Sequence, residues 1–146
     1  MKNYKDLIFT LSKINKDDLF HVFLIPNQTS AIVTKLIISV FNLNKENFIL
    51  VPLRKTNTSF INGPYFDYSE SIFNRLLIKF FKTYPLTNNL LRLINKKNKP
   101  FVLYTSWVYY DSISTPSVEK ILALKLCRGH FYIEEGQLNY RKSIPY

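Results

Sequence analysis

The residues best suited to chemistry are two adjacent glutamates, Glu134 and Glu135, followed by Gly136. They come directly after an apolar run at 130–133 that is typical of a short strand. In parallel α/β sheets, binding sites form outside the carboxyl ends of the strands. A carboxylate partly removed from water there has a raised pKa and can act as a general base, and the glycine permits a sharp turn. A solvated acidic turn, or a pair of residues capping a helix, would show the same pattern.

Two further groups of polar residues follow predicted strands. One group comes after residues 20–25, and the other comes after the aromatic-rich residues 101–110. At the carboxyl ends of parallel strands these side chains would line the same crevice as the glutamates. The candidates for binding an acceptor substrate there are Asn27, Gln28, Thr29, Ser30, Asp111, Ser112 and Ser114.

The elements that must position these residues alternate between strands and helices. Near-continuous apolar runs predict strands at 20–25, 48–53, 101–110 and 130–133. Helices are predicted from Thr29 or Ser30 to about 41, at 70–84, at 87–94, and from 114 to 126 with Gly129 as C-cap. The first helix has on its apolar side Ile32, Val33, Leu36, Ile37 and Val40. The predicted fold class is α/β, a Rossmann-like and mostly parallel sheet with helices on both faces.

Length and composition limit the classes of protein to which the chain can belong. With 146 residues there is room for one domain, and an apolar share of 47% excludes disorder. Three glycines are too few for a glycine-rich phosphate loop, and one cysteine excludes a disulfide framework or a cysteine-based zinc site. No cluster has metal-ligand spacing. The longest apolar stretch, 31–41, is too short to span a membrane, so a cytoplasmic location is expected.

The net charge of +10 comes from 20 Lys and Arg against 10 Asp and Glu. An AT-rich genome favours Lys, Asn and Ile and explains part of this excess, and an anionic partner would explain the rest. Residues 75–99 contain seven basic residues and no acid. This segment could lie on an anionic membrane surface, or it could be an ordinary surface segment. Only 5 of the 20 basic residues are arginines, which bind phosphates and bases bidentately, so nucleic acid is not the favoured partner.

Residues 132–140 resemble the acidic-acidic-glycine motif of bacterial sialyltransferases, the lipooligosaccharide and polysialic acid enzymes of capsule and surface-glycan synthesis. The resemblance includes the aromatic-aliphatic strand before the motif and the polar, tyrosine-containing segment after it. It implies the N-terminal, acceptor-side half of a GT-B fold. It also implies that Glu135, or alternatively Glu134, removes the proton from the acceptor hydroxyl, with Gly136 providing the turn. The reaction would be inverting transfer of sialic acid from CMP-sialic acid to a glycan, for example a lipid-linked one at the inner membrane, without a cofactor.

The chain departs from that family because it has neither the family's His-Pro motif nor the Ser/Thr-rich donor-phosphate site expected beyond it. The family has a His-Pro motif in its C-terminal half, where the histidine handles the donor phosphate; here His21 precedes Val22 and His130 precedes Phe131. His21 is expected in the core, and His130 at the amino end of its strand, away from the site. The chain ends ten residues after Gly136. Residues 1–146 are therefore expected to be a single acceptor-side domain without its nucleotide-sugar domain, inactive unless another chain supplies the missing half.

Two alternatives to a transferase half stay open at this point. One is a basic α/β module that binds nucleic acid, and the other is a gene fragment without function. Salt-sensitive nucleic-acid binding would distinguish the first alternative, and failure to fold would distinguish the second.

Overall fold

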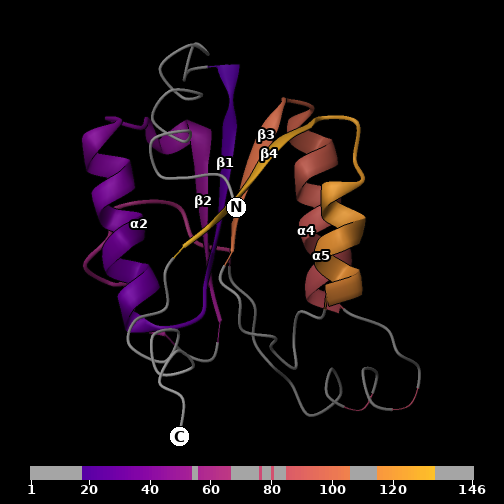
Figure 1. The fold of residues 1–146 in the computed structure, drawn as a ribbon, viewed down its shortest axis with the longest axis horizontal. Coiled ribbons are helices and arrows are strands. Elements are labelled where there is room, and N and C mark those ends of the chain that lie inside the picture. The colour runs from indigo at the N-terminus through magenta and orange to yellow at the C-terminus, as the bar shows by residue number, and fades with distance from the viewer. Residues whose placement is uncertain are drawn as a thin grey trace, which may run out of the picture.

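Four parallel strands form one sheet in the order β2-β1-β3-β4. The structure is a computed structural model that describes residues 18–53, 56–66, 76, 80, 85–105 and 115–133. Figure 1 shows helix α2 on one side of the sheet and helices α4 and α5 on the other. The predicted fold class is therefore confirmed as a Rossmann-like, parallel α/β sheet covered on both faces. The strands are β1 (Phe20–Ile25), β2 (Phe48–Pro52), β3 (Phe101–Thr105) and β4 (Cys127–Tyr132); the helices are α2 (Gln28–Val40), α4 (Pro85–Lys97) and α5 (Thr115–Leu122), with a short 3-10 helix η2 (Lys45–Asn47).

Side chains alternate between the two faces of each strand and so build two separate cores. In β1, Phe23 and Ile25 belong to the core shared with α2, whereas Val22 and Leu24 belong to the core shared with α4 and α5. Because both faces are buried, every residue of β1 is buried. This explains why the strands are continuous apolar runs in the sequence.

Helix α2 has its N-cap two or three residues before Thr29 or Ser30, the residues predicted to cap it. Its N-cap is Asn27, not Thr29 or Ser30, because the Asn27 side-chain oxygen accepts a hydrogen bond from the Ser30 backbone N–H at 2.9 Å. The backbone N–H of Asn27 in turn donates to the Ser30 hydroxyl at 3.2 Å. This reciprocal pair is a capping box, which fixes where α2 starts.

The side of α2 that faces the sheet was only partly predicted. Ala31, Thr34 and Ile37 are buried, with Val33 and Ile38 packed at the margin of the core. Ile32, Leu36 and Val40 were expected on the apolar side with them, yet they are 50%, 57% and 66% exposed. The prediction was therefore wrong for these three residues, which form an exposed row on the outer face of α2.

Helix ends also differ from the prediction. Helix α4 spans Pro85–Lys97 rather than the predicted 87–94, and Asn98, which follows it, has a φ of 48°. Helix α5 ends at Leu122 rather than at 126. Of the predicted helix at 70–84, only Leu76 and Phe80 are described, and both are helical.

Gly129 is not a helix C-cap, because it lies inside β4 and pairs with Val102 of β3. A side-chain Cβ at Gly129 would lie 3.2 Å from Val102 Cγ1 and 3.3 Å from the Phe131 ring. Strand β4 therefore starts three residues earlier than predicted. The pairing shifts by one residue after Cys127, so that Arg128 is an extra residue in the edge strand.

Candidate functional site

The strand order marks one place on the sheet where a site is favoured. The chain runs outward from β1 to β2 in one direction and from β3 to β4 in the other, so the order reverses between β1 and β3. In open parallel sheets, ligands bind outside the carboxyl ends of the strands at such a point. In this chain that edge carries the start of α2 after β1, the end of β3 at Thr105, and the end of β4.

Of the four candidates after β1, two have a structural task. Ser30 is fully buried, and its hydroxyl donates to the Asn27 backbone oxygen at 2.8 Å. Asn27 and Ser30 are therefore engaged in the capping box described above. Gln28 and Thr29, in contrast, are exposed in the first turn of α2. They are the members of this group whose side chains face solvent at the carboxyl edge.

The remaining predicted site residues lie outside the described residues. They are Glu134, Glu135, Gly136, Asp111, Ser112 and Ser114. The described chain reaches Ile133, whose backbone N–H donates to the Thr105 oxygen at 2.7 Å. Parallel pairing with β3 thus continues to Ile133, the residue that precedes Glu134 in the sequence.

Three residues at this edge were missed by the sequence reasoning: Thr105, His130 and Tyr132. The Thr105 hydroxyl oxygen lies 2.6 Å from His130 Nε2, and the His130 and Tyr132 ring centroids are 4.5 Å apart. His130 had been expected at the amino end of a strand starting at that residue. Because β4 starts at Cys127, His130 is instead its fourth residue and pairs with Leu103. The available signal was the spacing of His130 and Tyr132, two residues apart in a strand and hence on one face.

The environment of His130 determines its charge. Partial burial lowers the pKa of the His130 imidazole below its ordinary value of 6.5, so the ring is neutral at neutral pH. A neutral ring has one nitrogen that donates and one that accepts. The pair with Thr105 therefore forms either with the hydroxyl donating to Nε2 or with Nε2 donating to the hydroxyl. In both cases one defined hydrogen bond fixes the orientation of the ring.

The second histidine belongs to the core, as expected. His21 is fully buried, its Nδ1 lies 3.0 Å from the Tyr104 hydroxyl, and its ring stacks on those of Tyr104 and Phe23. Burial lowers the pKa of His21 to about 4 and raises the pKa of Tyr104. His21 pairs with Phe48 and Val102 near the start of the strands, so it lies away from the carboxyl edge.

The described basic residues of the segment 75–99 lie on α4 and in the turn after it. Leu90 and Ile94 of α4 are buried in the core with α5 and the sheet, so the apolar side of this helix is occupied by its own domain. Lys97 lies 5.4 Å from the centroid of the Phe20 ring, and Lys99 Nζ donates to Asn47 Oδ1 at 3.3 Å. These contacts are at the amino edge, opposite the candidate site. Contact with an anionic membrane stays a prediction.

Comparison with protein-family models, curated proteins and solved structures gave no match. Within the described ranges, no group of three or more His, Cys, Asp or Glu residues could hold a metal ion. None of the helices described is both long and apolar enough to cross a bilayer.

The described groups at the carboxyl edge are uncharged and rich in hydrogen-bonding atoms. They comprise a neutral imidazole, a phenol, and the exposed amide and hydroxyl of Gln28 and Thr29. Strands β1 and β4 are separated only by β3, which places their ends about 10 Å apart. The imidazole and the phenol lie on the face of the sheet covered by α4 and α5, whereas Gln28 and Thr29 begin the helix on the other face. Either group can hydrogen-bond a hydroxyl-rich ligand, whereas acid–base chemistry would have to come from Glu134 or Glu135, the next residues in the sequence.

Proposed function

We propose that this domain is the acceptor-binding side of a glycosyltransferase similar to the bacterial sialyltransferases, with Glu135 or Glu134 as the general base. The observation that supports the proposal is that parallel pairing of β4 with β3 reaches Ile133, the residue immediately before the acidic pair in the sequence. Parallel strands of an α/β sheet deliver their next residues to the edge where ligands bind. The resemblance of residues 132–140 supplies the reaction class.

In this proposal the glutamate takes the proton of an acceptor hydroxyl while that oxygen attacks the anomeric carbon of the sialic acid. A new carbon–oxygen bond forms on one face, and the bond from that carbon to the phosphate oxygen breaks on the other. The electron pair leaves with CMP, so the configuration inverts in a single displacement. General-base assistance of this kind contributes about 10²–10⁴-fold to a rate.

Binding of the acceptor is the part of this reaction that the chain can be tested for directly. The donor-phosphate motif of the family, His-Pro, does not occur in the sequence, so turnover of CMP-sialic acid by this chain alone is not expected. Saturation-transfer NMR with the full chain and a panel of galactose- and sialic-acid-terminated oligosaccharides measures acceptor binding. We expect at least one oligosaccharide to bind with a Kd on the order of 1 mM or below, typical of a single weak site.

Variants of the acidic pair test its place in the site. A carboxylate that accepts a hydrogen bond from the acceptor hydroxyl contributes about 1.5–3 kcal/mol, so Glu135→Gln or Glu134→Gln should weaken glycan binding about tenfold or more. Glu119→Gln, which removes an exposed acid from α5, is the matched control and should bind like the parent chain. A folded chain that binds no oligosaccharide of the panel, or binds equally well without either carboxylate, overturns the proposal.

A further inference from the structure

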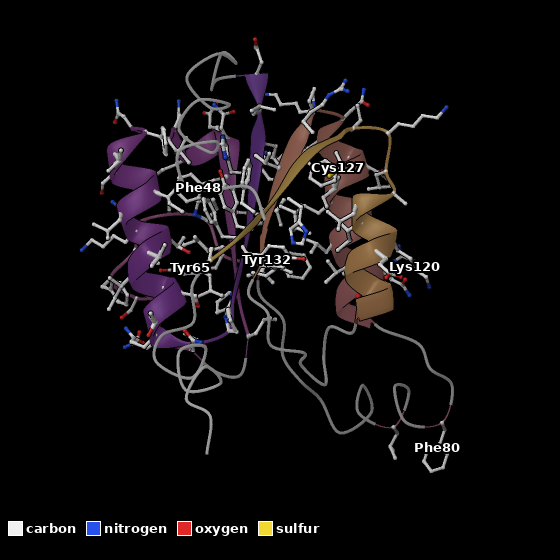
Figure 2. All side chains as sticks on the ribbon, in the orientation of Figure 1. Phe48, Tyr65, Phe80, Lys120, Cys127 and Tyr132 are labelled. Atoms are coloured by element: carbon white, nitrogen blue, oxygen red, sulfur yellow. The ribbon has the colours of Figure 1, made fainter. Side chains whose placement is uncertain are left out.

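Two aromatic rings lie on one face of the edge strand β4, immediately before the acidic pair. His130 and Tyr132 pair with Leu103 and Thr105 of β3 and share their face of the sheet, the one covered by α4 and α5. Figure 2 shows Tyr132 at the end of β4. The Tyr132 side chain is 48% exposed, unusually open for a large ring in so buried a sheet. Its position is two residues before Glu134 along the chain.

Thr105 fixes the orientation of His130, and His130 contacts Tyr132. Thr105 is only 5% exposed, and its hydroxyl oxygen lies 2.6 Å from His130 Nε2. The His130 ring in turn contacts the Tyr132 ring, with centroids 4.5 Å apart and the planes inclined by 51°. A buried hydroxyl thus orients the imidazole, and the imidazole supports one side of the phenol. A surface ordered before a ligand arrives loses less conformational entropy on binding.

The chemistry of the pair indicates which ligand it suits. Burial lowers the pKa of the His130 imidazole below its ordinary value, so this ring is neutral at neutral pH. A phosphate or carboxylate ligand would be bound by Arg or Lys, or by a row of backbone N–H groups. An uncharged aromatic face with polar atoms at its rim instead complements a pyranose ring, which has C–H groups on its faces and hydroxyls around its edge.

We propose that His130 and Tyr132 form a stacking platform for a neutral hexose ring of the acceptor glycan, with Thr105 as the residue that positions His130. This inference rests on the proposed function and adds the part of the domain that holds the acceptor sugar. Tyr132 precedes Glu134 by two residues in the sequence, so the platform adjoins the segment that carries the proposed general base.

The test measures binding of the tightest oligosaccharide of the panel above to the full chain. Tyr132→Ala should weaken binding at least tenfold, whereas Tyr132→Phe, which keeps the ring, should weaken it less than threefold. Leu36→Ala is the matched control, because Leu36 is a 57% exposed apolar side chain on the outer face of α2. Leu36→Ala should leave binding unchanged. Should Tyr132→Ala fail to fold, Tyr132→Leu keeps the apolar bulk but not the aromatic face, and should weaken binding equally.

Thr105 is tested by substitution and rescue. Thr105→Val removes the hydroxyl but keeps the shape, so we expect glycan binding to weaken about three- to fivefold in a chain that still folds. Thr105→Ser restores the hydroxyl and should restore binding, a rescue that a role in packing alone would not produce. Equal binding by the parent chain, Tyr132→Ala and Tyr132→Leu overturns the platform but leaves the proposed function standing. If the parent chain binds no glycan, both are overturned.

Discussion

The two histidines of this chain show how one residue type takes different tasks at different depths. His21 is buried under a stack of aromatic rings, with Tyr104 as hydrogen-bond partner for one nitrogen. Its Nε2 has no hydrogen-bond partner among the described residues. His130 lies at the edge of the sheet, where Thr105 occupies one nitrogen and the rest of the ring is partly accessible. Burial keeps both rings neutral, but only His130 lies toward the carboxyl edge of the sheet.

The buried His21 makes stability depend on pH. Its pKa is about 4 in the folded chain and 6.5 in the unfolded chain, so the unfolded state binds more protons between these values. The contribution of neutral His21 to the free energy of unfolding is therefore fully present above about pH 6.5 and is lost as the pH falls toward 4. From pH 7 to pH 4.5 this one group should lower the free energy of unfolding by about 2.5 kcal/mol, which urea unfolding at the two pH values measures.

A double variant isolates that contribution. His21→Phe with Tyr104→Phe removes both polar partners together, which avoids leaving a buried hydroxyl unpaired. The double variant should lose about 2.5 kcal/mol less than the parent chain over the same pH interval, because the carboxylates and His130 act equally in both. Identical losses in the two proteins would show that His21 takes up its proton without cost in the folded state.

At the scale of the element, the sequence predicted where α2 lies but not which side of it is buried. Lys35 is the one charged residue in α2, so the pattern does not mark the outer face. The structure buries Ala31, Thr34 and Ile37 and leaves Ile32 and Leu36 outside. Small side chains at Ser30 and Ala31 allow the start of the helix to approach the sheet closely. Such a choice depends on how helix and sheet fit together, which a one-dimensional pattern does not contain.

Two neighbouring residues of α2 test this assignment. Ile37→Ala should lower the free energy of unfolding by about 2–5 kcal/mol, because it leaves a cavity in the core. Leu36→Ala, one residue earlier and mostly exposed, should change it by no more than about 0.5 kcal/mol. Thermal or urea unfolding of the two variants gives the comparison. A loss of 2 kcal/mol or more for Leu36→Ala would mean that another part of the chain covers this side of α2.

The sequence likewise predicted the strands that carry the candidate site but not all of the contacts within it. Strands β1, β2 and the described start of β3 were found within a residue, because a buried parallel strand is a continuous apolar run. The pairing of Thr105 with His130 was not predictable, because it depends on the register of β4 on β3. That register shifts at Cys127 with one extra residue, and no sequence signal marks the shift. The alternation of two faces was predictable in principle, and it correctly places His130 with Tyr132.

At the scale of the whole molecule, the two edges of the sheet differ in character. Helix α4 runs opposite to the strands, so its basic end at Lys96 and Lys97 lies at the amino edge, near Phe20. The candidate site lies at the carboxyl edge, where the described groups are uncharged. Among the described residues, the basic end of α4 and the candidate site therefore lie at opposite edges of the sheet.

A net charge of +10 destabilises a compact chain of this size by self-repulsion, and added salt screens that repulsion. Raising NaCl from about 0.02 M to about 0.3 M, which shortens the screening length to well under 10 Å, should therefore raise the melting temperature at constant pH.

Lys96→Glu with Lys125→Glu reverses two exposed lysines and lowers the net charge from +10 to +6. Each substitution alone should change the free energy of unfolding by no more than about 0.5 kcal/mol, while the pair should visibly reduce the rise of melting temperature with salt. Lys96→Arg with Lys125→Arg keeps the charge and should keep the parent's salt dependence. A melting temperature that falls with NaCl, or a salt dependence that is the same in the Glu and Arg variants, would mean that specific ion pairs rather than net repulsion determine how salt acts on this domain.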